Sequence, residues 1–300
     1  MPASHPPRDR SAPPPDEPLL LACDIDGTIL DPDGHLRPRV RDALRVVAGA
    51  GVIVLLASGR SPWGMRGLCS ELGLRGPQIT MHGGLIVSPI TGDVLHASPL
   101  SDTDVRRHVE FAHGLGLEVF CTHPEGYRAE VPPSPALLEV VAPSTAVGGP
   151  PFEVVPSLAG SAGPRPIRTV LVTPPGRAVE ARAAALGRFG DAYSLVWSDD
   201  IALELLAPGV NKGAALRLVA ERHGVRMDAV AAIGDAPNDI EMLRCAGRSA
   251  AMASAPPDVR DAATLVVPPN SDDGAFEALR AFFPLTLSGR VPVPGLDRAV

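Results

Sequence analysis

The segment from Leu19 to Leu30, LLLACDIDGTIL, decides the fold of this chain. It begins with an apolar run and then places two carboxylates at alternate positions, Asp24 and Asp26, before a Gly-Thr pair. A continuous apolar run is typical of a strand buried on both faces, as in a parallel sheet covered by helices. Ligands bind beyond the carboxyl ends of such strands, so we expect the functional site at these two aspartates.

The composition is that of a globular chain with one large or two medium-sized domains. Its 300 residues are 45% hydrophobic and 20% charged, which provides enough apolar material for a sizeable core. The net charge of -7 and the pI near 5.6 argue against a general nucleic-acid binder, because binding to phosphate backbones needs a basic face. No apolar run approaches the ~20 residues that span a bilayer, so we expect no membrane segment.

Cysteine usage indicates a reducing compartment. The cysteines are far apart and show neither CxxC spacing nor histidine-rich surroundings, so we expect reduced, mostly buried thiols and a cytoplasmic location. They are Cys23, Cys69, Cys121 and Cys245. Residues 1–18 contain seven prolines, and we expect a disordered tail there rather than a signal peptide.

After the opening strand, the chain alternates helices with buried strands. Helical spacing follows Pro38, the run VIVLLA at 52–57 predicts a second strand, and another helix is expected from Ser61 to about Gly73. Such strand–helix–strand units imply parallel strands with right-handed connections. The C-terminal part repeats the pattern, with helices expected from residues 211, 237 and 272 and strands at 229–233, 250–253 and 264–267.

We therefore predict an α/β fold, with a Rossmann-like parallel sheet core, helices on both faces and an inserted α+β cap domain. The core is expected at 19–84 and 199–283, the cap at 85–198, and a loose tail at 284–300. Within these bounds, 78–81 predicts a third short strand and 85–99 an antiparallel hairpin. The segment 142–166 is rich in proline and glycine, and no structure is assigned to it.

Four groups of polar residues each follow a predicted core strand or begin a helix, so they would meet along one edge of the sheet. Aspartates gathered at one crevice repel one another unless a cation lies among them, and carboxylate oxygens suit Mg2+. A hydroxyl, glycine amides and an ammonium suit the oxygens of a phosphate group. The groups are Asp24/Asp26, Ser58-Gly59-Arg60, Lys212, and Asp235/Asn238/Asp239.

Each group taken alone also has a purely structural interpretation. Asp24 and Asp26 could be turn residues, and Ser58-Gly59 could be a turn with a helix cap. Asn238-Asp239 could stabilise a helix N-terminus. Lys212 could be a solvated charge, but it is the only lysine in a chain that otherwise uses arginine, which favours a need for a compact ammonium. The ordered combination indicates phosphoryl transfer.

This ordered set resembles the haloacid dehalogenase superfamily of phosphatases. The position of the middle block resembles the Cof-type subgroup, whose large α/β (type IIB) cap is inserted between the second motif and the lysine. The resemblance is specific over the core and weak over the cap. The similar segments are Asp24-Ile25-Asp26-Gly27-Thr28, Ser58-Gly59-Arg60, Pro208-Gly209-Val210-Asn211-Lys212-Gly213, Gly234-Asp235, Asn238-Asp239 and Asp273-Gly274.

The resemblance implies a Mg2+-dependent hydrolase of small phosphomonoesters, such as a sugar phosphate, that works through an aspartyl-phosphate. Asp24 would be the nucleophile, and Asp26 would protonate the leaving oxygen and later activate water. Mg2+ would be held by the Asp24 carboxylate, the Asp26 backbone carbonyl and Asp235. Asp239 would be a further ligand or would support the others. The residues implied in holding the phosphate oxygens are Ser58, Gly59, Lys212 and Asn238.

Two positions depart from the subgroup's pattern. His82-Gly83 stands where the subgroup usually has Asn-Gly, and Ala253-Ser254 replaces its usual Gly-Asn. Both flank the expected crevice, so they bear on substrate choice more than on the reaction. Arg60 and His82 are candidate substrate contacts, and His82 could equally be a satisfied loop histidine. Cap residues that could reach the crevice, or lie in the core or on the surface instead, are His123, Glu125, Tyr127, Arg128 and Trp197.

The sequence alone is also compatible with three other functions. A phosphomutase would pass the same aspartyl-phosphate to a second hydroxyl, a signalling receiver would keep it, and a binding protein would have lost the activity. Asp26 and the inserted block argue against a receiver, which needs neither a leaving-group acid nor a cap. The expected partner is a small-molecule phosphomonoester, and the sequence specifies neither its identity nor the oligomeric state.

Overall fold

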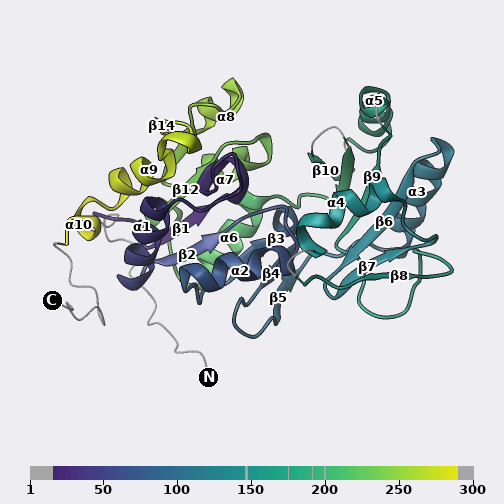
Figure 1. Cartoon of the computed structure of the whole chain (residues 1–300), viewed down its shortest axis with the longest axis horizontal. Coiled ribbons are helices and arrows are strands. Elements are labelled where there is room, and N and C mark those ends of the chain that lie inside the picture. Colours follow the sequence, from purple (N-terminus) through teal and green to yellow (C-terminus); the bar gives the residue numbers. More distant parts are fainter. Residues whose placement is uncertain (1–15, 146–147, 175, 191, 199–200, 290–300) are drawn as a thin grey trace.

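The computed structural model of the chain describes residues 16–145, 148–174, 176–190, 192–198 and 201–289. It forms two lobes, each built on its own sheet, with a small third sheet between them (Figure 1). The predicted fold class, an α/β core with an inserted cap, is confirmed. Among the described residues, no helix combines the length and apolar character needed to cross a membrane.

The first lobe is a five-stranded sheet in which every pairing is parallel. The opening strand lies in the interior of this sheet, as its apolar sequence predicts, with its four residues fully buried. The strands, in spatial order, are β14 (Leu265–Val267), β13 (Arg248–Met252), β12 (Val230–Gly234), β1 (Leu20–Cys23) and β2 (Ile53–Leu56).

Alternate side chains of β1 point to opposite faces of this sheet, and each face is covered by helices. Leu21 and Cys23 join the apolar cluster beneath α1 (Pro38–Gly49), α2 (Pro62–Leu72) and α9 (Gly274–Phe282). Leu20 and Ala22 join the cluster beneath α6 (Lys212–Arg222), α7 (Ile240–Cys245) and α8 (Pro257–Ala262). The doubly covered sheet thus directs the carboxyl end of β1 into a crevice at the sheet edge.

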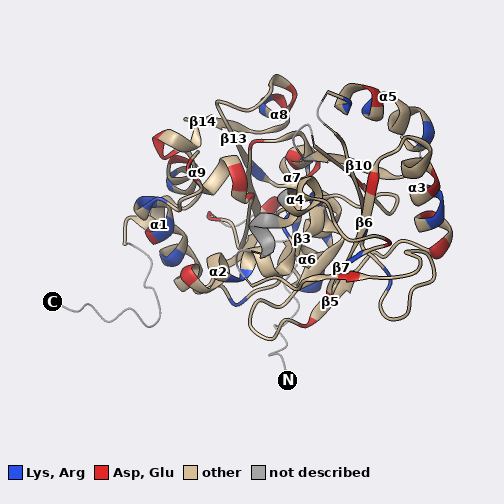
Figure 2. Ribbon diagram, turned by 45° about the vertical axis from the view of Figure 1, so that its right-hand side comes forward, with Lys and Arg blue, Asp and Glu red and all other residues tan. Residues whose placement is uncertain are grey.

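The second lobe is a six-stranded sheet, antiparallel except for one parallel pair at its edge. Its strands, in spatial order, are β10 (Ser194–Ser198), β11 (Ala202–Leu206), β9 (Arg168–Val172), β6 (Glu118–His123), β7 (Gly126–Ala129) and β8 (Phe152–Val154). Helices α3 (Asp102–Gly114) and α5 (Ala178–Phe189) pack on one face, and α4 (Pro135–Thr145) packs on the other. Acidic and basic residues are interspersed on α3 and α5 (Figure 2).

The cap boundaries expected at residues 85 and 198 do not coincide with the first and last strands of the cap sheet. The predicted hairpin forms as β4 (Leu85–Val87) and β5 (Val94–Ala97), but it pairs with β3 (Gln78–Thr80) in the separate three-stranded sheet. At the other end, β11 lies beyond residue 198 and pairs with β9 in the cap sheet. Strand pairing decides both boundaries, and the pairing partner of a strand cannot be read from the strand's own periodicity.

Three segments for which the sequence predicted no regular structure have ordered contacts in the described residues. The unassigned segment 142–166 contains β8, an edge strand between prolines that pairs with β7. The C-terminal segment expected to be loose begins with a short helix, α10 (Pro284–Leu287), which packs on α1. The carboxylate of Glu17, in the tail expected to be disordered, accepts hydrogen bonds from the Leu285 and Thr286 amides and the Thr286 hydroxyl. Residues 1–15 and 290–300 lie outside the described residues.

The four cysteines are free thiols, and the three most buried are Cys23, Cys69 and Cys121. Burial raises the pKa of both Cys69 and Cys121 to about 12, so neither is a reactive thiolate at neutral pH. The prediction of reduced, mostly buried cysteines is confirmed.

Candidate active site

Asp24 follows β1 directly and remains anchored to the neighbouring strand, because its amide donates to the carbonyl of Ile233 at 2.9 Å. The chain then makes an irregular helical turn over Ile25–Ile29, in which Gly27 has a φ of +80°. A Cβ on Gly27 would lie 2.3 Å from Oδ2 of Asp235. Glycine therefore permits both the turn and the close approach of Asp235.

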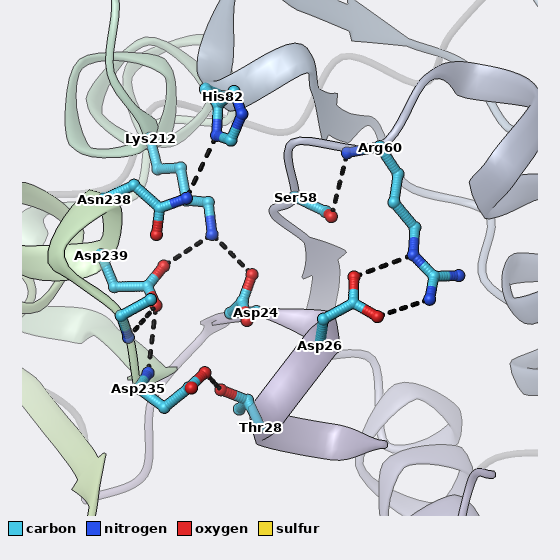
Figure 3. A network of polar contacts seen from close by, with 11 residues as sticks. Asp24, Asp26, Thr28, Ser58, Arg60, His82, Lys212, Asp235, Asn238 and Asp239 are labelled. Carbon is cyan, nitrogen blue, oxygen red and sulfur yellow. Dashed lines mark hydrogen bonds and ion pairs between the residues drawn. The ribbon is translucent and has the colours of Figure 1, made fainter. Parts of the chain in front are cut away.

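Lys212 is the central cation of the site. Asn211 caps α6, its side-chain oxygen accepting from the Ala214 amide at 2.7 Å, so that Lys212 begins the helix. Its side chain is 1% exposed, and Nζ donates to Asp24 Oδ1 at 2.5 Å and to Asp239 Oδ1 at 2.7 Å (Figure 3). The surface-charge interpretation is wrong. Burial alone would lower the pKa of Lys212, but Asp239 and Asp24 together raise it above its usual value.

Asp239 has both carboxylate oxygens engaged. Oδ1 accepts from Lys212, and Oδ2 accepts from the backbone amides of Asp235 and Ala236, each at 3.0 Å. Gly234 makes room for this arrangement, because a Cβ there would lie 2.6 Å from the Asp239 Cγ. Asp239 therefore holds the loop after β12 and positions Lys212, which favours a supporting role over direct metal ligation.

Asp24, Asp235 and Asp239 form an acidic cluster whose oxygens lie within 4.8 Å of one another. With Lys212 beside them, the formal charge of the group is three negative plus one positive, or -2. Asp24 and Asp235 each keep one oxygen outside the contacts with Lys212 Nζ and with Thr28 Oγ1, which donates to Asp235 Oδ1 at 2.6 Å. A divalent cation with a preference for oxygen ligands matches both this charge and this donor set, so the residues fit Mg2+.

Burial and crowding change the acidity of these carboxyl groups. Burial is the main reason that the pKa of Asp24 lies well above its usual range, with Lys212 opposing the shift and Asp239 and Asp235 adding to it. Burial also raises the pKa of Asp235, against the hydrogen bond from Thr28. Both pKa shifts reflect mainly the cost of burying a charged carboxylate, and the neighbouring carboxylates add to it.

Asp26 lies apart from this cluster. Its side chain is 59% exposed and is held by two hydrogen bonds from Arg60, with Nε to Oδ2 at 2.9 Å and Nη2 to Oδ1 at 2.5 Å (Figure 3). The side chain of Arg60, predicted as a substrate contact, is thus engaged with Asp26. The two aspartates of the opening segment therefore have different surroundings, one buried beside an ammonium and the other at the crevice mouth.

Ser58 and Asn238 line the same crevice as Asp24, and Lys212 donates to Asp24 (Figure 3). The Ser58 side chain is buried, and its Oγ accepts from the Arg60 amide at 3.1 Å. Asn238 Nδ2 lies 3.1 Å from His82 Nδ1, and His82 is 4% exposed. The residues predicted to hold phosphate thus come together at the same edge, and His82 lines the same crevice.

The crevice lies between the two lobes and has a volume of about 430 Å³. Of the five cap candidates, Tyr127 and Trp197 line it. Arg128 pairs instead with Glu125 and Glu153, at 3.0 and 2.7 Å, and His123 Nδ1 lies 2.7 Å from the Pro164 carbonyl.

Sequence reasoning missed three polar residues of the site, namely Thr28, Arg168 and Glu204. Arg168 of β9 donates from Nη1 to the Gly59 carbonyl at 2.9 Å and pairs with Glu204 of β11. Thr28 belongs to the first motif, but its hydroxyl was not predicted to contact Asp235. The sequence signal that could have identified Arg168 and Glu204 is a single charged residue within an otherwise apolar strand.

Together these features define a hydrolase-type site in which an acidic cluster and a buried ammonium lie at the carboxyl edge of a parallel sheet, beneath an inserted cap. The family model of the haloacid dehalogenase-like hydrolases matches residues 21–279, and the chain belongs to this family.

Individual relatives extend over most of the chain. It is 31% identical to the HMP-PP phosphatase of Cronobacter sakazakii over 242 residues, covering 80% of this chain and 86% of that protein. A haloacid dehalogenase-like hydrolase from Bacteroides thetaiotaomicron superposes with a TM-score of 0.76 at 24% identity, covering 88% and 99% of the two chains. A subclass IIB sugar phosphatase superposes with a TM-score of 0.74 at 20% identity, covering 88% and 98%.

Proposed function

We propose that the protein is a Mg2+-dependent phosphatase of small phosphomonoesters, acting through an aspartyl-phosphate on Asp24. The observation that carries the proposal is the surroundings of Asp24, where Lys212 Nζ lies 2.5 Å away and Asp235 and Asp239 complete an acidic cluster. A carboxylate held beside an ammonium and a cation site is suited to attack a phosphorus atom whose oxygens those charges neutralise. The phosphatase name of the relative in Cronobacter sakazakii supports the same activity.

In the first step, an Asp24 oxygen attacks phosphorus in line with the bond to the leaving oxygen, and Asp26 gives that oxygen a proton. Asp26 must release Arg60 to do so, because both of its oxygens accept from the guanidinium. In the second step, Asp26 takes a proton from the water that attacks phosphorus, which returns Asp24 and releases phosphate. The exposed position of Asp26 at the crevice mouth favours contact with the leaving group and with water.

Asp24 and Asp235, supported by Thr28 and Asp239, would hold Mg2+, with the Asp26 backbone carbonyl as a further ligand. When bound, the ion would neutralise charge on the transferred phosphoryl group. Ser58 Oγ, the Gly59 amide, Lys212 Nζ and Asn238 Nδ2 would hold the phosphate oxygens. They come from the loop after β2, the first turn of α6 and the short 3-10 helix Pro237–Asp239, so that the phosphorus would be presented to the Asp24 carboxylate.

A sugar phosphate or a similar phosphorylated metabolite is the substrate class that we propose. The crevice of about 430 Å³ suits a small leaving group. The likeness to a subclass IIB sugar phosphatase supports a sugar, while the HMP-PP phosphatase name points to a different substrate in a similar chain.

The test is hydrolysis of p-nitrophenyl phosphate with Mg2+ and with EDTA, followed by a panel of phosphorylated metabolites. We expect activity only with Mg2+, and loss of activity and of phosphoenzyme formation in Asp24→Asn. Asp26→Asn should still form the phosphoenzyme with this good leaving group, but should turn over slowly. Full turnover by Asp24→Asn would refute the proposal. Isomerisation stimulated by a sugar bisphosphate would indicate a mutase, and a phosphoenzyme that survives for minutes would indicate a receiver.

A further inference from the structure

The imidazole of His82 occupies a fixed place between the two lobes. His82 and the preceding Met81 have φ angles of +56° and +48°, a conformation that is costly for residues with a side chain. The conformation is held by backbone hydrogen bonds, since the His82 amide donates to the Ser58 carbonyl and the Met81 amide to the Arg60 carbonyl, both at 3.0 Å. A Cβ on Gly59 would lie 2.2 Å from the imidazole Cε1. The ring therefore lies directly against the phosphate-binding loop.

Both ring nitrogens of His82 face polar groups. Nε2 lies 3.3 Å from Oε2 of Glu204 on β11, close enough for an electrostatic contact although not aligned as a hydrogen bond. Nδ1 lies 3.1 Å from Nδ2 of Asn238, which directly precedes Asp239 in the short 3-10 helix Pro237–Asp239. A chain of polar contacts thus runs from Glu204 of the cap through the imidazole to Asn238, and Figure 3 shows its last link, between His82 and Asn238.

The Glu204 oxygen that faces Nε2 also accepts from Arg168, so Glu204 acts on the imidazole by its charge and not by a hydrogen bond. A carboxylate facing Nε2 favours a proton on that nitrogen, and in the neutral ring Nδ1 is then an acceptor. An acceptor at Nδ1 requires Asn238 to present its NH2 group, not its carbonyl oxygen. Because an amide nitrogen carries two hydrogens, one can bind His82 while the other is directed into the crevice. Without the imidazole, the Asn238 amide could turn over and present an acceptor to the phosphate.

We propose that His82 is a positioning residue, which holds the Asn238 amide with its nitrogen towards the phosphate site in a tautomer set by Glu204. This rests on the proposed function, since it assigns a task within phosphate binding. It gives His82 a task in addition to the substrate contact expected from the sequence, because His82 also lines the crevice. The cap thereby acts on the phosphate site through two contacts, the imidazole and the Arg168 hydrogen bond to the Gly59 carbonyl.

Two substitutions of His82 distinguish the roles of its two ring nitrogens. Asparagine places a side-chain oxygen near the position of Nδ1, so His82→Asn can still accept from Asn238. Glutamine reaches only the position of Nε2, so His82→Gln loses that acceptor. We expect kcat/KM for p-nitrophenyl phosphate to fall about 3- to 10-fold in His82→Gln, as for the loss of one hydrogen bond, and distinctly less in His82→Asn. The inhibition constant of inorganic phosphate should rise in parallel.

The decisive measurement is a double-mutant cycle with Asn238→Ala. If His82 acts through Asn238, His82→Gln should change neither kcat/KM nor the phosphate inhibition constant once Asn238 is alanine. A merely structural role would instead lower kcat/KM by the same factor in both backgrounds. Thermal unfolding of each variant checks that the protein remains folded. The matched control is His123→Gln, another buried histidine, which lies outside the crevice and should leave both constants unchanged.

Additive effects, or equal losses in His82→Asn and His82→Gln, would overturn the positioning role while the wild-type protein still hydrolyses its substrate with Mg2+. A wild-type protein that hydrolyses no phosphomonoester would overturn the proposed function and this inference with it. Coupling in the cycle together with the weaker effect of asparagine would establish the role.

Discussion

Replacing Lys212 by methionine tests the charge balance of the site most directly. Methionine keeps an unbranched apolar stem but removes the ammonium that donates to Asp24 and Asp239. The formal charge of the buried group changes from -2 to -3. Removal of one partner from a buried ion pair costs about 3–5 kcal/mol, because the remaining charge is left uncompensated. Asp239 keeps its two amide donors, so we expect about 3 kcal/mol, the lower end of this range.

For a protein of this size, that loss corresponds to a fall in Tm of roughly 6–12 °C, at 2–4 °C for each kcal/mol. The assay is thermal unfolding followed by circular dichroism in EDTA and again with Mg2+. The deficit should shrink with Mg2+, because a divalent cation restores positive charge beside Asp24. Activity should be lost in both conditions, since Lys212 is also a proposed phosphate ligand.

The matched control is Arg217→Met, which removes an exposed cation from the same helix and should shift stability by no more than about 0.5 kcal/mol. Adding Asp24→Asn to Lys212→Met should recover part of the lost stability, because it removes one of the uncompensated carboxylates. If Lys212→Met unfolds in EDTA at the wild-type temperature, then the ammonium does not stabilise the cluster and the reasoning fails.

Three further substitutions address the acidic cluster. Because burial raises the pKa of Asp24, ionisation there costs folding stability at every pH above the unfolded pKa of about 3.9. Asp24→Asn should therefore unfold at a higher temperature than wild type at pH 7 in EDTA, with the advantage shrinking towards pH 4. Thr28→Val removes the 2.6 Å hydrogen bond to Asp235 and should weaken Mg2+ binding, measured by calorimetry, by about 10–100-fold. Gly27→Ala should also weaken it, because the new Cβ would displace Asp235, and should lower Tm.

The parallel core was predictable because each of its main strands can be recognised from its own short stretch of sequence. LLLAC and VIVLLA are apolar runs bounded by turn or cap residues, and a polar cluster at the end of each marks the sheet edge. The helix expected from Ser61 to about Gly73 is observed as α2 (Pro62–Leu72) for the same reason, since its sequence pattern is local. By contrast, β8 was missed because an exposed edge strand between prolines carries no apolar pattern.

The site, like the fold, has a part that the sequence predicted and a part that only the structure shows. Asp24, Lys212 and Asp239 were placed together because each lies where a core strand ends or a helix begins. The separate role of each residue could be assigned only from the structure. Only the hydrogen bonds identify Asp239 as the anchor of Lys212, and only the paired guanidinium shows Asp26 in surroundings unlike those of Asp24.

The Arg168–Glu204 pair explains why the cap side of the site escaped sequence reasoning. RTVLV and ALELL each carry one charge in an otherwise apolar strand, and burying either charge alone would cost several kcal/mol. The two side chains are 10% and 8% exposed and lie on neighbouring strands, so each compensates the other. A buried pair of this kind contributes little net stability, and two apolar residues would cover the sheet as well. What the charged pair adds is two contacts between the cap and the core, because Arg168 donates to the Gly59 carbonyl and Glu204 faces the His82 ring. Opposite charges in two apolar cap strands thus mark the place where the cap meets the Ser58-Gly59 loop.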